Sequence, residues 1–149
     1  MNGRPEGCPR KRHRTETHAV PVKCAVPIFK VTDIHAALNF YCSTLGFVLE
    51  FKYSVTPDGP VYVGVSLDGV RIHLSTFAGN GASGTAAYLH VDDVDGLFQT
   101  FLERGFKTPG NPESPVEEGP VDQTWGMREF YIRDPDGNTL CFGTPIQTV

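Results

Sequence analysis

Val31-Thr32-Asp33-Ile34 is a short stretch that returns sixty positions later as Val91-Asp92-Asp93-Val94. In both copies an aspartate follows an apolar, alternating segment and stands directly before a new apolar residue. Aspartate is a good N-cap at such a place, because its carboxylate accepts hydrogen bonds from the free backbone N–H groups of a helix. Each copy therefore predicts a junction at which a strand ends and a helix begins.

Apolar residues follow both junctions at helical spacing, and each stripe ends at a glycine, Gly46 or Gly105, as helices commonly do. The first stripe consists of Ile34, Ala37, Leu38, Tyr41 and Leu45, and the second of Val94, Leu97, Phe98, Phe101 and Leu102.

Alternating segments bounded by turn residues predict the strands. The first copy has Cys24–Val31, with a proline inside it, then Phe47–Tyr53, Val61–Leu67 and Val70–Ser75. The second has Thr85–Val91, a strand beginning at Phe106, Arg128–Arg133 and Asn138–Gly143, with a long loop from Pro109 to Thr124. The turns Asp68-Gly69 and Asp136-Gly137 also correspond.

The whole pattern predicts an α+β fold of tandem βαβββ repeats, about residues 24–76 and 85–145. Neither repeat covers its own sheet, so the two should pair, with curved mixed sheets around a cleft. We expect one domain over residues 21–149 and a disordered N-terminal extension over residues 1–20.

The composition is that of a soluble globular protein, with 149 residues, 40% hydrophobic and 20% charged. No apolar run reaches the roughly 20 residues that span a bilayer, and no secretory signal is visible. The four cysteines are scattered, which suits a reducing compartment. These features predict a cytoplasmic protein with no membrane partner.

The net charge of −4 is unevenly distributed. Residues 1–18 carry five basic and two acidic side chains, a net of +3, so the remaining residues carry −7. An acidic body disfavours nucleic acid as a partner and favours a cationic small molecule. The role of the basic residues 1–18 stays open.

The motifs together resemble the vicinal oxygen chelate superfamily, which includes glyoxalase I, extradiol dioxygenases, and fosfomycin and bleomycin resistance proteins. The resemblance spans about residues 24–145. It rests on the pattern from Val31 to Gly46-Phe47, on the second junction, and on Asp134-Pro135-Asp136-Gly137-Asn138. It implies the fold and says little about function.

Enzymes of this superfamily bind a divalent metal at four symmetry-related strand positions, which the resemblance places at Val26, His73, Ala86 and Cys141. Two of these residues cannot bind a metal ion. A catalytic site needs about three protein ligands and an open position. We therefore expect no cofactor and no catalytic residue, and His73 and Cys141 are the only candidate metal ligands at these positions.

The stretch from Trp125-Gly126 through Arg128 to Phe130 resembles the bleomycin resistance branch. That branch consists of non-catalytic homodimers, often with an exchanged N-terminal strand, that sequester the drug in grooves at the subunit interface. The resemblance implies that Trp125 stacks on the flat bithiazole of a cationic, bleomycin-like molecule. Gly126 would let the backbone approach closely. Acidic residues of the preceding loop would form a rim: Glu113, Glu117, Glu118 and Asp122.

Strand parity places further candidates toward the cleft, namely Phe51, Tyr62, His73 and Tyr88. Arg128 either contacts the ligand or pairs with a carboxylate such as Glu129. Two other functions stay open. One is a metal-dependent glyoxalase-like or dioxygenase-like enzyme with an altered ligand set. The other is a binder of a different aromatic small molecule.

Overall fold

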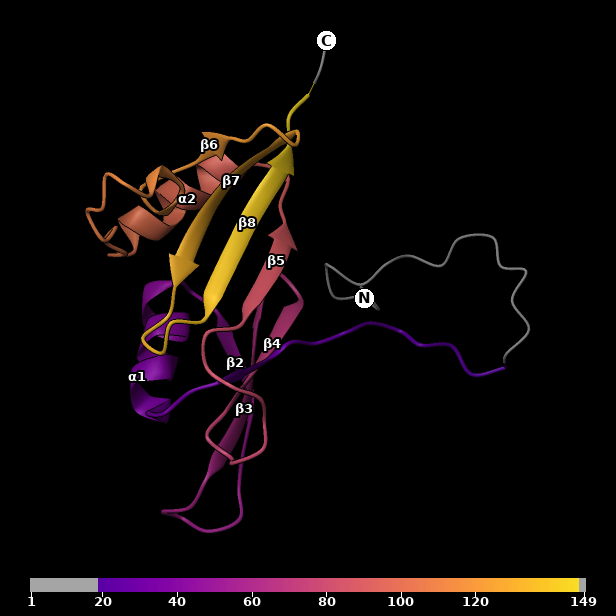
Figure 1. Ribbon diagram of the computed structural model, residues 1–149. Coiled ribbons are helices and arrows are strands. Elements are labelled where there is room, and N and C mark those ends of the chain that lie inside the picture. The colour runs from indigo at the N-terminus through magenta and orange to yellow at the C-terminus, as the bar shows by residue number, and fades with distance from the viewer. Residues whose placement is uncertain (1–18, 148–149) are drawn as a thin grey trace.

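The computed structural model describes residues 19–147, and two four-stranded mixed sheets organise them (Figure 1). Sheet A has the order β1-β4-β3-β2 and sheet B the order β5-β8-β7-β6. In each sheet the first strand of the unit runs parallel to the last one, and the other neighbours are antiparallel. The predicted tandem βαβββ architecture is confirmed. The expected extension lies, over residues 1–18, outside the described residues.

The elements follow the order of the repeat. The first half contains β1 (Ile28–Lys30), α1 (Ile34–Leu38), η1 (Asn39–Thr44), β2 (Val48–Ser54), β3 (Val61–Leu67) and β4 (Val70–Ser75). The second half contains β5 (Ala86–His90), α2 (Val94–Glu103), η2 (Pro115–Glu117), β6 (Val121–Asp122), β7 (Met127–Arg133) and β8 (Thr139–Pro145).

Both predicted helix starts are capped as expected. The Asp33 carboxylate accepts hydrogen bonds from the backbone N–H groups of His35 and Ala36, at 2.9 and 3.2 Å. The Asp93 carboxylate accepts one from Gly96 at 3.0 Å. The first helix is less regular than the sequence predicts, because α1 continues into the π-helical turn η1.

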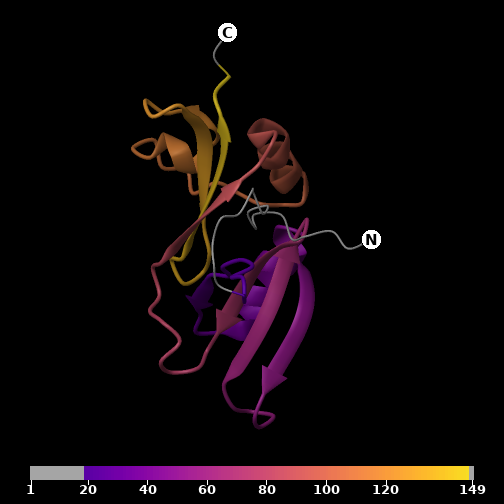
Figure 2. The same cartoon turned by 90° about the vertical axis from the view of Figure 1, so that its right-hand side faces the viewer.

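Each half packs its helix on one face of its own sheet (Figure 2). Apolar side chains on that face form the core, including Ile72 and Leu74 of β4 and Leu140 and Phe142 of β8, all at most 1% exposed. The other face of each sheet carries no helix, and we call it the open face. Strand parity therefore divides core from open face as the sequence predicts.

The turn between β7 and β8 ties the two halves together. Asp134 is buried and accepts a hydrogen bond from the Tyr41 hydroxyl of η1 at 2.9 Å. The amide of Asn138 donates to the Lys30 carbonyl of β1 at 2.9 Å. The Thr32 hydroxyl donates to Asp136 at 2.8 Å. We call this turn, residues 134–138, the clasp.

Two strand predictions were wrong. The first strand begins at Ile28 and not at Cys24, because Pro27 has no N–H to offer the sheet. The residues before it run away from the body of the molecule (Figure 1). No strand begins at Phe106. The outer strand of sheet B is β6, only two residues long, inside the segment expected to be loop.

Candidate functional site

Three aromatic rings lie together on the open face of sheet A. Phe51 of β2 is stacked on Tyr62 of β3, with ring centroids 6.1 Å apart and planes 13° apart. Both rings meet His73 of β4 edge-on, at 5.3 and 5.2 Å. The Tyr62 hydroxyl lies 2.7 Å from His73 Nδ1. The structure thus brings three of the expected ligand-binding residues into one cluster.

A hollow of about 430 Å³ lies beside this cluster. Phe51 and His73 form part of its lining, together with Gly64 and the charged residues Glu50 and Arg71. Burial and the nearby Arg71 lower the pKa of His73, so its imidazole is neutral at neutral pH. Glu50 accepts a short hydrogen bond from Ser66. The hollow therefore offers the Phe51 ring as an apolar surface, with polar groups beside it.

The open face of sheet B is built differently. Glu129 of β7 is fully buried there, although it is a carboxylate. The Tyr88 hydroxyl of β5 donates to one of its oxygens at 2.7 Å, and the Tyr131 hydroxyl donates to the other at 3.1 Å. The Tyr88 ring lies 5.1 Å from the ring of His90 and is 42% exposed. Tyr88, the fourth aromatic candidate, thus belongs to a separate cluster.

Cys141 of β8 lies beside this carboxylate and is buried. Burial, with the charge of Glu129 as a second cause, raises the pKa of its thiol to about 11. Burial and the hydrogen bond to Glu129 raise the pKa of Tyr131 to about 12 and that of Tyr88 further. None of these three groups is ionised at neutral pH.

Trp125 stands in the turn between β6 and β7 and is 62% exposed. Gly126 adopts a φ of +88°, a conformation that glycine accepts and L side chains rarely do. Its carbonyl accepts a hydrogen bond from the Ile146 N–H at 2.8 Å, which fixes the turn against the end of β8. The tryptophan is therefore outside the core, and its side chain is available at the tip of the turn.

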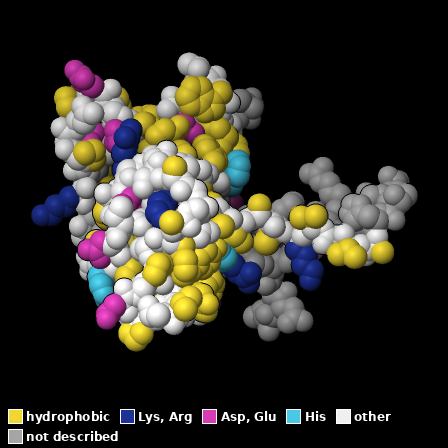
Figure 3. All heavy atoms as spheres, turned by 60° about the horizontal axis from the view of Figure 1, so that its bottom comes forward, with side chains coloured by type: hydrophobic (Ala, Val, Ile, Leu, Met, Phe, Trp, Pro, Cys, Tyr) yellow, Lys and Arg dark blue, Asp and Glu magenta, His cyan; other side chains and the backbone are white. Residues whose placement is uncertain are grey.

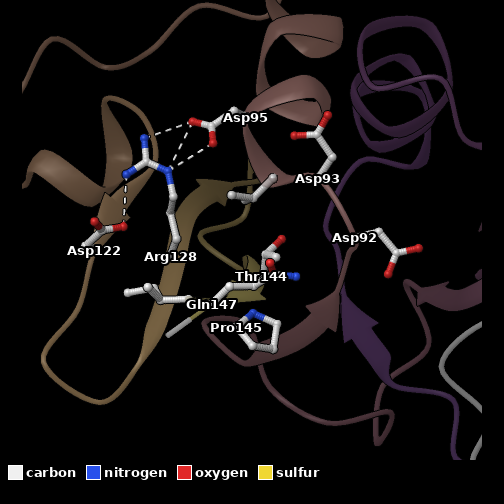
Figure 4. Close-up of a pocket in the computed structure, with 10 residues that line it drawn as sticks. Asp92, Asp93, Asp95, Asp122, Arg128, Thr144, Pro145 and Gln147 are labelled. Atoms are coloured by element: carbon white, nitrogen blue, oxygen red, sulfur yellow. Dashed lines mark hydrogen bonds and ion pairs between the residues drawn. The ribbon is translucent and has the colours of Figure 1, made fainter. Parts of the chain in front are cut away.

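Arg128 lies on the helix-covered side of β7, and its guanidinium points toward Asp95 and Asp122 (Figure 4). Strand parity places the Glu129 side chain on the other face. The Arg128 guanidinium binds both oxygens of Asp95 in α2, at 2.9–3.2 Å, and Asp122 of β6 at 3.0 Å. These bonds hold the pKa of Asp95 below its usual range. Of the two roles left open for Arg128, the structure supports pairing with carboxylates. Its partners are these two aspartates and not Glu129.

The expected acidic rim is largely used for local contacts. Glu117 forms an ion pair with Arg133 at 2.7 Å. The carboxylate of Glu118 accepts hydrogen bonds from the backbone of Gly110 and Asn111. Asp122 is held by the arginine described above. Three of the four acids expected to form the rim therefore make contacts within the protein that fix the proline-rich loop and β6.

The four positions implied for a metal do not form a metal site. His73 is hydrogen-bonded to Tyr62, Cys141 keeps its proton at neutral pH, and Val26 lies before the start of β1. Among the side chains of residues 19–147, no three His, Cys, Asp or Glu groups come close enough to hold an ion. The residues present do not fit the superfamily's metal, and we derive no reaction through one.

Sequence reasoning missed the partners of Glu129. It also missed that Gly64 packs against the Phe51 ring and Gly143 against the Tyr88 ring. Glu129 and Tyr131 alternate with the core residues Phe130 and Ile132, so strand parity alone places them on the open face. The internal repeat, however, does not indicate that these two residues bind each other. The clasp is longer than the turn after β3. An alignment of the two repeats by sequence therefore does not pair Glu129 with Tyr62, whereas the strand register does.

Comparison with known proteins identifies relatives of this chain. The model of the Glyoxalase/Bleomycin resistance protein/Dioxygenase superfamily matches residues 25–142. A bleomycin resistance protein of Geobacillus stearothermophilus is 28% identical over 142 residues, covering 83% of this chain and 98% of the relative. Bleomycin resistance proteins of Staphylococcus aureus match to the same extent.

Solved structures of similar fold include two antibiotic-binding proteins. The bleomycin-binding protein of Streptomyces verticillus, in complex with copper(II)-bleomycin, has a TM-score of 0.60 at 24% identity, over 87% of this chain and 99% of that one. An antibiotic-binding protein of Streptomyces sp. CB03234 has a TM-score of 0.58 at 27% identity, over 89% and 99%. Within residues 19–147, no helix has the length and apolar character needed to cross a membrane.

Proposed function

This chain belongs to the glyoxalase/bleomycin resistance protein/dioxygenase superfamily, and we propose that it is a non-catalytic member that sequesters a bleomycin-type antibiotic. The observation that carries the proposal is the hollow on sheet A, which is lined by the Phe51 ring. A planar heteroaromatic group stacks on such a ring with a gain of roughly 0.5–1.5 kcal/mol for each ring pair. The relatives named for bleomycin resistance or binding support the same ligand.

Trp125 supplies a second aromatic surface. An exposed tryptophan beside a glycine has no role in the core, and its ring offers the largest stacking and cation–π surface of any side chain. The net charge of −7 on residues 19–149 attracts a cationic drug at long range. Binding, protection by sequestration and release of the unchanged drug follow from these features without any chemical step.

We further propose that the working form is a homodimer with a ligand groove at the subunit interface. Every residue of β2 is exposed, which is unusual for a seven-residue strand rich in apolar side chains. Val48, Phe51 and Tyr53 are 62%, 42% and 58% exposed. Hydrophobic side chains also gather in Figure 3, over the body and along the segment that leads away from it. A second copy covering this surface would close the hollow of sheet A.

The experiment is a titration with metal-free bleomycin, followed by the fluorescence of Trp125, the only tryptophan. We expect saturable quenching and full recovery of unmodified drug. By calorimetry, Trp125→Ala should weaken binding about tenfold, and Trp125→Phe, which keeps an aromatic surface, by less. Sedimentation should give twice the chain mass. The calorimetric stoichiometry should be one drug per chain. Absence of saturable heat at tens of micromolar drug, or turnover of the drug, contradicts the proposal.

A further inference from the structure

The open face of sheet B contains a fully buried carboxylate whose visible partners are all neutral. Glu129 accepts hydrogen bonds from Tyr88 and Tyr131, and no salt bridge reaches it from any residue in 19–147. The nearest arginine in sequence, Arg128, lies on the helix side and is saturated by two aspartates. A buried charge with neutral partners alone is costly, and a cation close by would compensate it.

Two phenols connect this buried carboxylate to the open face of the sheet. Each hydroxyl donates its proton to the carboxylate, so each phenol oxygen keeps its lone pairs. Hydrogen bonds in such chains polarise one another, which makes the phenol oxygen more negative. The exposed ring of Tyr88 adds a π-face of the kind that attracts cations.

Shape supports the same use. Tyr88 lies against the backbone of Gly143, where any Cβ would collide with its hydroxyl. His90 lies beside its ring. The tyrosine is therefore held over the carboxylate.

We propose that Tyr88, Tyr131 and Glu129 form a recognition site for an organic cation, an alkylammonium or similar group, on the open face of sheet B. This site is separate from the aromatic hollow of sheet A. The proposal rests on the proposed function in one respect, namely that the cation belongs to the same ligand that stacks on the aromatic surfaces. Glu129 does not touch the ligand; it acts by supplying charge through the two tyrosines that do.

The test uses choline and 3,3-dimethyl-1-butanol, which share a shape and differ only in charge, as probes of the full-length protein. Amide resonances of β5, β7 and β8 should move with choline, and the neutral alcohol should bind at least roughly tenfold more weakly. Glu129→Gln keeps the size of the side chain and removes its charge. It should weaken choline binding about tenfold.

The control is Glu103→Gln, which removes the same charge at the exposed end of α2, on the helix side of sheet B, and should leave choline binding unchanged. Equal binding of choline and the alcohol to the unaltered protein overturns the inference, and so does the absence of any choline-dependent shift. The same holds if folded Glu129→Gln binds choline normally. Bleomycin binding, measured on the same samples, reports on the proposed function separately. Choline binding without bleomycin binding would refute that function alone.

Discussion

The open faces of the two sheets share a construction and differ in charge. In sheet A, Phe51 lies over Gly64, and in sheet B, Tyr88 lies over Gly143. Beneath the rings, the matching strand positions hold Tyr62 with a neutral imidazole in one sheet and the Glu129 carboxylate in the other. Each open face thus carries an aromatic ring packed on a glycine, but the strand register does not match the two pairs, since Tyr88 corresponds to Ile28 and Gly143 to Ser75. The polar groups at the matching positions differ as well. One chain thereby presents two chemically different surfaces.

The turns that close the two sheets differ in the same way. Asp68-Gly69 is a tight two-residue turn, whereas residues 134–138 form the clasp. At the matching positions stand Val70, half-buried, and Asn138, fully buried. The amide of Asn138 donates to Lys30 and Asp134, and its oxygen accepts from the backbone of Gly84. Among residues 19–147, the turn of the second half is therefore hydrogen-bonded to the first half, and the turn Asp68-Gly69 makes no such bond to the second.

The largest expected effect comes from breaking the clasp. Asn138→Ala leaves a half-buried carbonyl and a buried carboxylate short of a donor, so we expect the free energy of unfolding to fall by about 3 kcal/mol. Val70→Ala, its counterpart in sheet A, should cost only about 1 kcal/mol, because it removes half-buried methyl groups and no hydrogen bond. Urea denaturation measures both. Equal losses in the two halves would contradict the asymmetry.

The next effect tests the glycines under the rings. A Cβ at Gly143 would lie 1.9 Å from the Tyr88 hydroxyl, and one at Gly64 would lie 2.2 Å from the Phe51 ring. Gly143→Ala must displace a donor from buried Glu129, and we expect a loss of about 2 kcal/mol. Gly64→Ala displaces a ring that is already 42% exposed and leaves no polar group unsatisfied. It should cost less than about 1 kcal/mol. A greater loss for Gly64→Ala in urea denaturation would reverse the comparison.

Much of this comparison could be read from the sequence. The two aspartate caps, the helical stripes and the alternation in β4, β7 and β8 depend on local rules, and each is in place. The repeat also predicted that His73 and Cys141 occupy matching positions, as the strand register confirms. Periodicity and capping are encoded over a few residues, which is why a single sequence suffices for them.

The misses have physical causes of longer range. Pro27 delayed the first strand, and a loop with four prolines left β6 only two residues long. The sequence left open a contact between Arg128 and the ligand. The position of Arg128 on the helix side of β7 instead pairs it with Asp95, which is thirty-three residues away. For Glu129 the sequence suggested only Arg128 as a partner, because Tyr88 reaches it from another strand. Contacts between distant segments depend on register, and the longer clasp obscured that register.

The last comparison concerns the matched pair His73 and Cys141. The Cys141 thiol has a pKa of about 11 when folded, against about 8.5 for an unfolded cysteine. At pH 8 its alkylation should therefore be about 100-fold slower in the folded protein than in urea, as followed by mass spectrometry of the peptide. Because the folded pKa is raised, the stability linked to this proton is complete below about pH 8.5 and is lost as the pH rises toward 11. Glu129→Gln removes a nearby negative charge, so it should lower the thiol pKa and speed alkylation, whereas Glu50→Gln on sheet A should not. Alkylation at the unfolded rate would show that burial and Glu129 do not raise the pKa of the Cys141 thiol.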